Sequence, residues 1–208
     1  MGDDDSMDHA MAGRHMEEMG GPMALHMNYS APRPANPPDD ARAREIVALL
    51  RRILPRYNDY HAAQRDGFVP FHPEFKQRMV HFTNYRSALK AMFTFDPAAF
   101  TSLLYEPTPE GGYKLVGVMY TAPRWASEDQ LDQRIPLSVT SWHRHVNLCL
   151  PPRGADLTAV DWKQFGGEGT IATKAQCKAV GGRFLRQIFG WMVHVYPLEK
   201  SRAEIWAH

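Results

Sequence analysis

Apolar residues recur at helical spacing near the start of the main part of the chain. They stand three and four positions apart at Ile46, Leu49, Leu50, Ile53, Leu54, Tyr57 and Tyr60. This spacing predicts an amphipathic helix, with Asp39 or Asp40 as its N-cap and Gly67 as its stop. Pro55 lies inside the pattern and is expected to kink the helix or divide it in two.

Beyond Gly67 the pattern changes to short apolar runs that are typical of strands. The clearest run is 113–120, which follows the turn-like sequence 107–112. The other predicted strands are 79–84, 103–106, 141–150 and 190–196, and short helices are expected at 85–93 and 173–180. Strands separated by turns, with a long helix in front, predict an α+β fold. In this fold the N-terminal amphipathic helix packs on a mainly antiparallel β-sheet or small barrel.

The first 38 residues differ from the rest in composition. Seven of the eleven methionines and three histidines lie there, and the proline-rich run 31–38 follows. Because proline is excluded from helix interiors and central strands, residues 1–38 are expected to be a disordered Met/His-rich tail and linker. Residues 39–208 are then expected to form a single metal-binding domain, and about 170 residues are enough to bury a core.

The formal net charge of +1 hides an asymmetry along the chain. Residues 1–40 contain eight acidic and two basic residues, a balance of −6, while residues 41–208 contain 15 acidic and 22 basic residues, a balance of +7. The small total argues against nucleic acid as the main partner, and no run approaches the ~18 apolar residues of a membrane span. The first residues lack the basic start and apolar run of a signal peptide. The chain is therefore expected to be either a cytoplasmic protein or an exported protein whose leader is absent.

The predicted strand 141–150 carries two histidines, His143 and His145. Side chains alternate along a strand, which puts both on one face together with Asn147 and Cys149, while the opposite face is apolar. Histidines two positions apart project in parallel, so both imidazoles can reach a single ion. Because imidazole suits zinc, copper, iron and nickel, the pair is a candidate metal site.

Two further histidines, His81 and His194, lie in apolar, strand-like runs. A lone histidine in such a run is more often a hydrogen-bonded core residue than a ligand. Beside the pair on 141–150, however, they complete a predicted site of four histidines. Glu106 ends the predicted strand 103–106 and is either a further ligand or general base, or a carboxylate that faces solvent.

Copper or zinc is the expected ion. Methionine thioether selects Cu(I), and the tail contains a set of residues suited to a flexible copper-collecting arm, namely His15, Met16, Met19, Met23, His26 and Met27. Incidental methionines in a disordered tail are the alternative. Cys149 is a candidate thiolate ligand beside His145. Otherwise Cys149 and Cys177 form a disulfide or stay as two buried thiols.

Several segments, mainly within residues 45–121, resemble a poorly characterised family of small exported bacterial proteins. Segment 64–70 resembles an "A-x-x-D-G-Y-V" turn, and 79–84 resembles an "M-G-x-H-x-x-N" strand, with Val80 in place of the glycine. The sequences LLYEP at 103–107 and LVGVMY at 115–120 follow, and His145 and His194 each precede valine, as in the family's "W-x-x-H-V" context. The resemblance implies export and a histidine site around His81, and no known reaction. Export makes a disulfide between Cys149 and Cys177 the expected state.

Together these features predict an exported protein, periplasmic or secreted, that binds copper or zinc. The predicted ligands are His81, His143, His145 and His194, and copper handling or tolerance is the expected role, with a periplasmic metal-handling protein as the candidate partner. One alternative is a zinc- or copper-dependent enzyme that uses Glu106 as its base. Another is a module that binds a small organic ligand without metal. Neither nucleic acid nor a membrane is a predicted partner.

Overall fold

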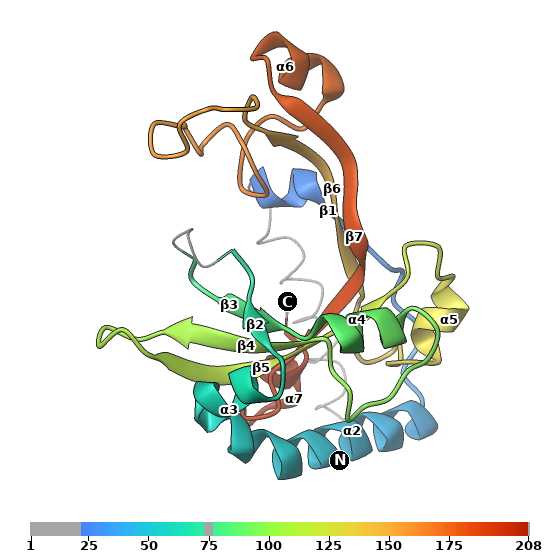
Figure 1. Cartoon of the computed structure of the whole chain (residues 1–208). Coiled ribbons are helices and arrows are strands. Elements are labelled where there is room, and N and C mark those ends of the chain that lie inside the picture. The colour runs from blue at the N-terminus through green and yellow to red at the C-terminus, as the bar shows by residue number, and fades with distance from the viewer. Residues whose placement is uncertain (1–21, 73–76, 208) are drawn as a thin grey trace. The chain divides into compact units, whose positions relative to one another are not determined.

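The computed structural model describes residues 22–72 and 77–207 (Figure 1). By its internal contacts the chain divides into two compact units. Of the described residues, unit 1 comprises 22–29 and 143–189, and unit 2 comprises 30–72, 77–142 and 190–207. The sequence led us to expect one body from residue 39 onward.

Unit 1 contains two strands of its own and the first part of a third. Its elements are η1 (Pro22–His26), β1 (Met27–Tyr29), β6 (His143–Leu150), α6 (Lys174–Ala179) and the start of β7 (Arg183–Val195). Residues 22–29 therefore have regular structure inside the segment expected to be a disordered tail. They do so because β1 pairs with β6, a contact between distant parts of the chain that local composition does not show. Residues 1–21 of the expected tail lie outside the described residues.

Unit 2 contains the long helix and most of the strands. Its elements are α2 (Pro37–Ile53), η2 (Leu54–Asn58), α3 (Tyr60–Arg65), β2 (Val69–Pro70), β3 (Val80–Thr83), α4 (Tyr85–Ala91), β4 (Ser102–Pro107), β5 (Tyr113–Ala122), α5 (Glu128–Asp132), the end of β7, and α7 (Arg202–Ile205). The helix 39–67 is divided at Pro55 as predicted, because α2 ends at Ile53 and a 3-10 turn follows. Its N-cap is Asn36, whose side chain accepts a hydrogen bond from the Asp39 N–H. The predicted caps Asp39 and Asp40 lie instead in the first turn, where carboxylates favour the helix dipole.

The strands pair in the order β1-β6-β7-β5-β4-β3-β2, and β7 passes from unit 1 into unit 2. Antiparallel pairs are formed by β2 with β3, β3 with β4, β4 with β5, β5 with β7, and β1 with β6. The predicted α+β class with an antiparallel sheet is therefore confirmed. The small-barrel form is wrong, since the described strands form an open sheet that ends at β1 and β2. A barrel needs its first and last strands to pair, and β2 has two residues, one of them Pro70, which has no N–H to donate.

The core of unit 2 lies between α2 and one face of the strands β3, β4, β5 and β7 (Figure 1). From α2 it takes the buried side chains of Ala43, Ile46, Val47 and Leu50. From the strands it takes alternate residues: Val80, Phe82, Leu103, Tyr105, Val118, Tyr120, Val193 and Val195. The residues between these point to the other face of the strands, which does not pack on α2.

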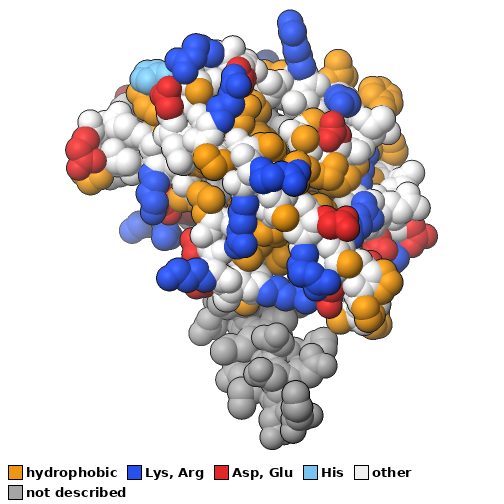
Figure 2. Space-filling model, turned by 90° about the horizontal axis from the view of Figure 1, so that it is seen from below, with side chains coloured by type: hydrophobic (Ala, Val, Ile, Leu, Met, Phe, Trp, Pro, Cys, Tyr) orange, Lys and Arg blue, Asp and Glu red, His pale blue; other side chains and the backbone are white. Residues whose placement is uncertain are grey.

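The exposed side of α2 is rich in arginine, including Arg44, Arg51 and Arg52. Figure 2, which views the molecule from the side of α2, shows Lys and Arg side chains scattered over this face with small hydrophobic areas between them. Arg51 donates hydrogen bonds to the carbonyl oxygens of Pro197 and Glu199, at 2.7 and 3.0 Å. The Arg51 side chain therefore holds α2 against the turn that follows β7.

Unit 1 has a small core around the predicted disulfide, which is confirmed. Cys149 on β6 and Cys177 on α6 are bonded, with their Cα atoms 5.5 Å apart. Ile171 is buried against them, and Phe165 and Phe184 pack on this cluster. A bonded Cys149 is neither a free thiol nor a thiolate ligand, so both of those alternatives are wrong.

Gly190 yields the first test of the fold, because a Cβ at this position would overlap the carbonyl oxygen of Ala122 on the neighbouring strand β5. We expect Gly190→Ala to lower the free energy of unfolding by about 1–3 kcal/mol, since backbone atoms have to move. Urea unfolding measures this loss. Gly167→Ala is the matched control, because a Cβ there meets nothing within 4 Å, and an equal loss in both variants would contradict the account.

The disulfide yields a second test. The bridge closes a loop with a sequence separation of 28, which corresponds to roughly 3–4 kcal/mol in the loop-entropy description. We expect the double variant Cys149→Ala and Cys177→Ala to lose stability of this order in thermal or urea unfolding. Unchanged stability of the double variant under non-reducing conditions would show that the bridge does not restrain unit 1.

Candidate metal site

The four predicted histidine ligands form two pairs, one in each unit. His81 on β3 and His194 on β7 both belong to unit 2, while His143 and His145 on β6 belong to unit 1. Within each unit the two members of a pair lie close together. Each pair is therefore a candidate site in its own right.

The imidazoles of His81 and His194 meet on the face of the unit 2 strands that does not pack on α2. Their Nε2 atoms are 3.4 Å apart, and their ring centroids are 5.5 Å apart with the planes tilted by 47°. Both residues are half-buried. This pair joins residues separated by 113 positions in the chain.

The two rings reach each other across two intervening strands. β4 and β5 lie between β3 and β7, which puts the two histidine backbones three strand spacings apart, roughly 14 Å on a flat sheet. Leu104 lies directly opposite His81 and next to Gly117, and Met119 lies directly opposite His194. The Tyr196 ring lies over Gly117, with its Cδ1 3.0 Å from where a Cβ would stand. The Gly117 backbone is so close to β7 that a Cβ would lie 2.5 Å from the Val195 carbonyl oxygen.

The distance between the two Nε2 atoms suits a shared metal ion. Zinc and copper bind imidazole nitrogen at about 2.0–2.1 Å. With such bonds, two nitrogens 3.4 Å apart subtend an angle of roughly 110–115° at the ion, which is close to tetrahedral. Between two histidines without metal, the same contact is a long hydrogen bond from one neutral ring to the other.

A cluster of methionines, with one tyrosine packed against it, shares this face of the strands with the histidine pair. Leu104, Met119 and Met192 form a buried cluster on this face, and Met79, Val116 and Tyr196 pack against it. The Tyr196 hydroxyl donates a weak hydrogen bond to the Met79 sulfur at 3.9 Å, and its ring centroid is 6.2 Å from that of His194. Burial, and then the negative charge of Glu106, raise the pKa of Tyr196.

Glu106 is the last residue but one of β4. Its side chain is 56% exposed and forms an ion pair of 3.9 Å with Lys114, which is itself 72% exposed. An exposed pair of this kind contributes little to stability. The structure thus places Glu106 as a solvated strand-end carboxylate, which is one of the two readings that the sequence left open.

In unit 1, His143 is buried and His145 is half-buried, with ring centroids 5.7 Å apart and nearly perpendicular planes. Burial, and then the charge of His26, lower the pKa of His145, which favours the neutral imidazole that binds metals. The predicted alternation of faces ends at Asn147, which has a φ of 57°. Beyond it Leu148 and Cys149 are both buried, so Cys149 does not continue the row of the two histidines.

His26 has a structural position that sequence reasoning missed, because it was assigned to a flexible arm. It is fully buried, with Nδ1 3.0 Å from the Asn147 carbonyl oxygen and Nε2 2.7 Å from that of Gly169. Carbonyl oxygens only accept hydrogen bonds, so each ring nitrogen of His26 faces a main-chain acceptor. His26 therefore ties η1 to β6 and to the loop at Gly169. No local sequence signal marks this role.

Across residues 22–72 and 77–207, no three or more His, Cys, Asp and Glu side chains gather in a group that could hold an ion. Over the same residues, no helix has the length and apolar character needed to cross a membrane. Comparisons with known proteins add nothing further, since no family model, curated protein or solved structure matches the chain.

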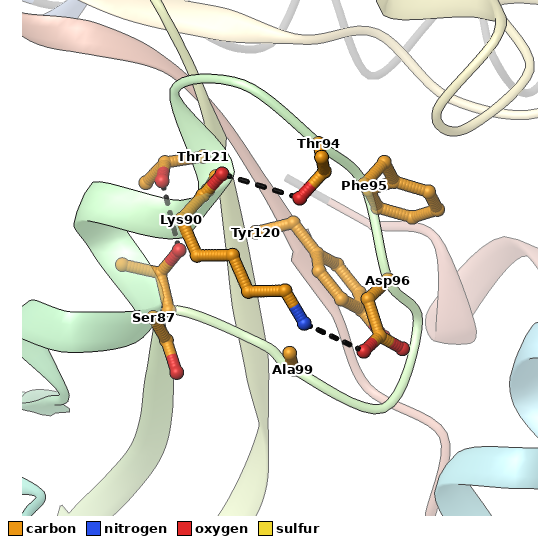
Figure 3. A pocket seen from close by; sticks show the side chains of 10 residues that line it. Ser87, Lys90, Thr94, Phe95, Asp96, Ala99, Tyr120 and Thr121 are labelled. Atoms are coloured by element: carbon orange, nitrogen blue, oxygen red, sulfur yellow. Dashed lines mark hydrogen bonds and ion pairs between the residues drawn. The ribbon is translucent and has the colours of Figure 1, made fainter.

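Two hollows elsewhere in unit 2 are less suited than the histidine pair to bind a ligand. The pocket in Figure 3, where Lys90 reaches Asp96 beside Tyr120, has a volume of about 10 Å³, which leaves room for about one water molecule. A shallow hollow of about 290 Å³ lies beside the exposed rings of Phe93 and Trp125. Its arginine, Arg134, donates to two backbone carbonyl oxygens and so serves the fold.

The buried hydrogen bonds of His26 lead to a prediction for His26→Ala. The variant removes the ring nitrogens that contact the carbonyl oxygens of Asn147 and Gly169, and a buried acceptor left without a donor costs about 1–3 kcal/mol. We expect a loss of at least about 2 kcal/mol in the free energy of unfolding, and no change in the number of tightly bound copper or zinc ions. His61→Ala is the control, because His61 is exposed on α3. Loss of the tight ion with unchanged stability would instead make His26 a ligand.

Proposed function

We propose that this protein is an exported metal-binding protein that holds one copper or zinc ion between His81 and His194, and that it acts in copper handling. The single observation that carries the proposal is the 3.4 Å separation of the two Nε2 atoms. Two neutral imidazoles at this distance present their lone pairs to one tetrahedral ion.

The surroundings of the pair support metal binding. The strands beneath the rings supply the buried side chains of Leu104 and Met119, which keep water away from an ion. The strands are held in register by the core on their opposite face, so the two ligands are presented by rigid elements. Rigid elements place ligands more accurately than loops do.

Export is supported by the disulfide in unit 1. Disulfides persist in the periplasm and outside the cell and are rare in the reducing cytosol. The periplasm or the extracellular space is therefore the proposed location, and a periplasmic metal-handling protein is the proposed partner. The resemblance to exported bacterial proteins points to the same compartment.

The proposal assigns the ion to one of the two histidine pairs. The prediction that His143 and His145 bind the same ion as His81 and His194 stays a prediction. Substitution of each pair separately tests it, because a shared ion is lost from both double variants. An ion held by the unit 2 pair alone is lost from only one of them.

The experiment measures tightly bound metal in the full chain after equilibrium dialysis against zinc and, separately, copper. We expect one tight equivalent in the wild type, and its loss in the double variant His81→Gln and His194→Gln. The matched double variant His143→Gln and His145→Gln is expected to keep it. Circular dichroism confirms that both variants are folded. A tight equivalent retained by the His81/His194 variant would contradict the proposal.

A further inference from the structure

We infer that the ion at this site is Cu(I), and that the Met119 thioether binds it together with His81 and His194. This inference rests on the proposed function, because it assigns a third ligand to the same histidine pair. It adds a residue that sequence reasoning did not select. The methionines singled out in the sequence belong to the first 27 residues, whereas Met119 is in the middle of β5.

The register of the strands puts Met119 beside the pair. Met119 on β5 is directly opposite His194 on β7, and directly opposed side chains on antiparallel strands have their Cβ atoms about 4.5–5.5 Å apart. Both side chains lie on the face that does not pack on α2. The His194 ring extends over β5 and the His81 ring over β4, and the two rings meet there. Met119, on β5, therefore lies on the sheet surface beneath the rings.

Met119 is also held in this place. Its side chain is 7% exposed and packs with Leu104 and Met192. On its other side Met119 faces Ser102, whose hydroxyl is hydrogen-bonded to that of Thr83 at 2.9 Å. The thioether of Met119 is thus a soft donor beside His194 near the centre of this sheet face.

The chemistry of this donor set selects the ion. A thioether is a soft, uncharged ligand that suits Cu(I), whereas zinc in proteins is bound by thiolate, imidazole and carboxylate. The one carboxylate that the sequence singled out, Glu106, is exposed and paired with Lys114. Two imidazoles and one thioether therefore favour Cu(I) over Zn(II).

The test compares Cu(I) and Zn(II) affinities of full-length variants, with Cu(I) supplied anaerobically as its acetonitrile complex and competed by a chromogenic Cu(I) chelator. Met119→Leu removes the sulfur at nearly constant volume, a change that cores tolerate. We expect it to weaken Cu(I) binding at least tenfold and to leave Zn(II) binding within about twofold. Met92→Leu, outside the methionine cluster, is the matched control and is expected to change neither affinity.

The outcomes separate this inference from the proposed function. Cu(I) affinity unchanged in Met119→Leu would overturn the thioether ligand, while the histidine site would stand if the His81/His194 double variant loses its ion. An equal fall in Cu(I) and Zn(II) affinity would also overturn it, because it would indicate a structural effect. Retention of both ions by the double histidine variant would overturn the proposed function and this inference together.

Discussion

The approach of His81 to His194 across two intervening strands is the contact on which the account of this protein depends. The register places Leu104 opposite His81 and Met119 opposite His194 on this face. Gly117, opposite Leu104, lies tightly against β7, and a Cβ there would meet the Val195 carbonyl oxygen and the Tyr196 ring. The opposite face of the same strands packs on α2 and fixes the register that brings Met119 opposite His194.

The two faces of this set of strands have different roles. One face supplies a conventional apolar core, which makes the strands rigid. The other supplies histidines and methionines, which are polar or soft but still bury apolar surface. A site of this kind contributes to packing without metal, because the methionines fill space as other apolar residues do.

Much of the fold could be predicted because its signals are local. The spacing of Ile46, Leu50 and Leu54 predicted α2, Pro55 predicted its end, and the run 113–120 predicted β5. Three features had no local signal. Strand β1 is short and forms only by pairing with β6, and the first part of β7 carries Arg183 and Arg186 and lacks the apolar run of its second part. Asn147, with its positive φ, interrupts the face alternation that was assumed for β6.

The candidate site was only partly accessible to sequence reasoning. His81 and His194 were chosen because each interrupts an apolar run, and the structure brings these two together. That they meet follows from the strand order β3-β4-β5-β7, which no spacing along the chain reveals. The same order brings in Met119, which the sequence presents as an ordinary apolar strand residue. His26 was predicted to belong to a flexible arm. In the structure it is buried and contacts two main-chain oxygens, so this prediction is wrong.

Anomalous X-ray diffraction at the copper edge, on crystals of the full chain loaded with Cu(I), tests the histidine site most directly. The account predicts an anomalous peak within about 2.0–2.1 Å of the Nε2 atoms of both His81 and His194, with the Met119 sulfur as the next donor. A copper peak bound elsewhere, with these two rings left in contact through a hydrogen bond, would contradict it.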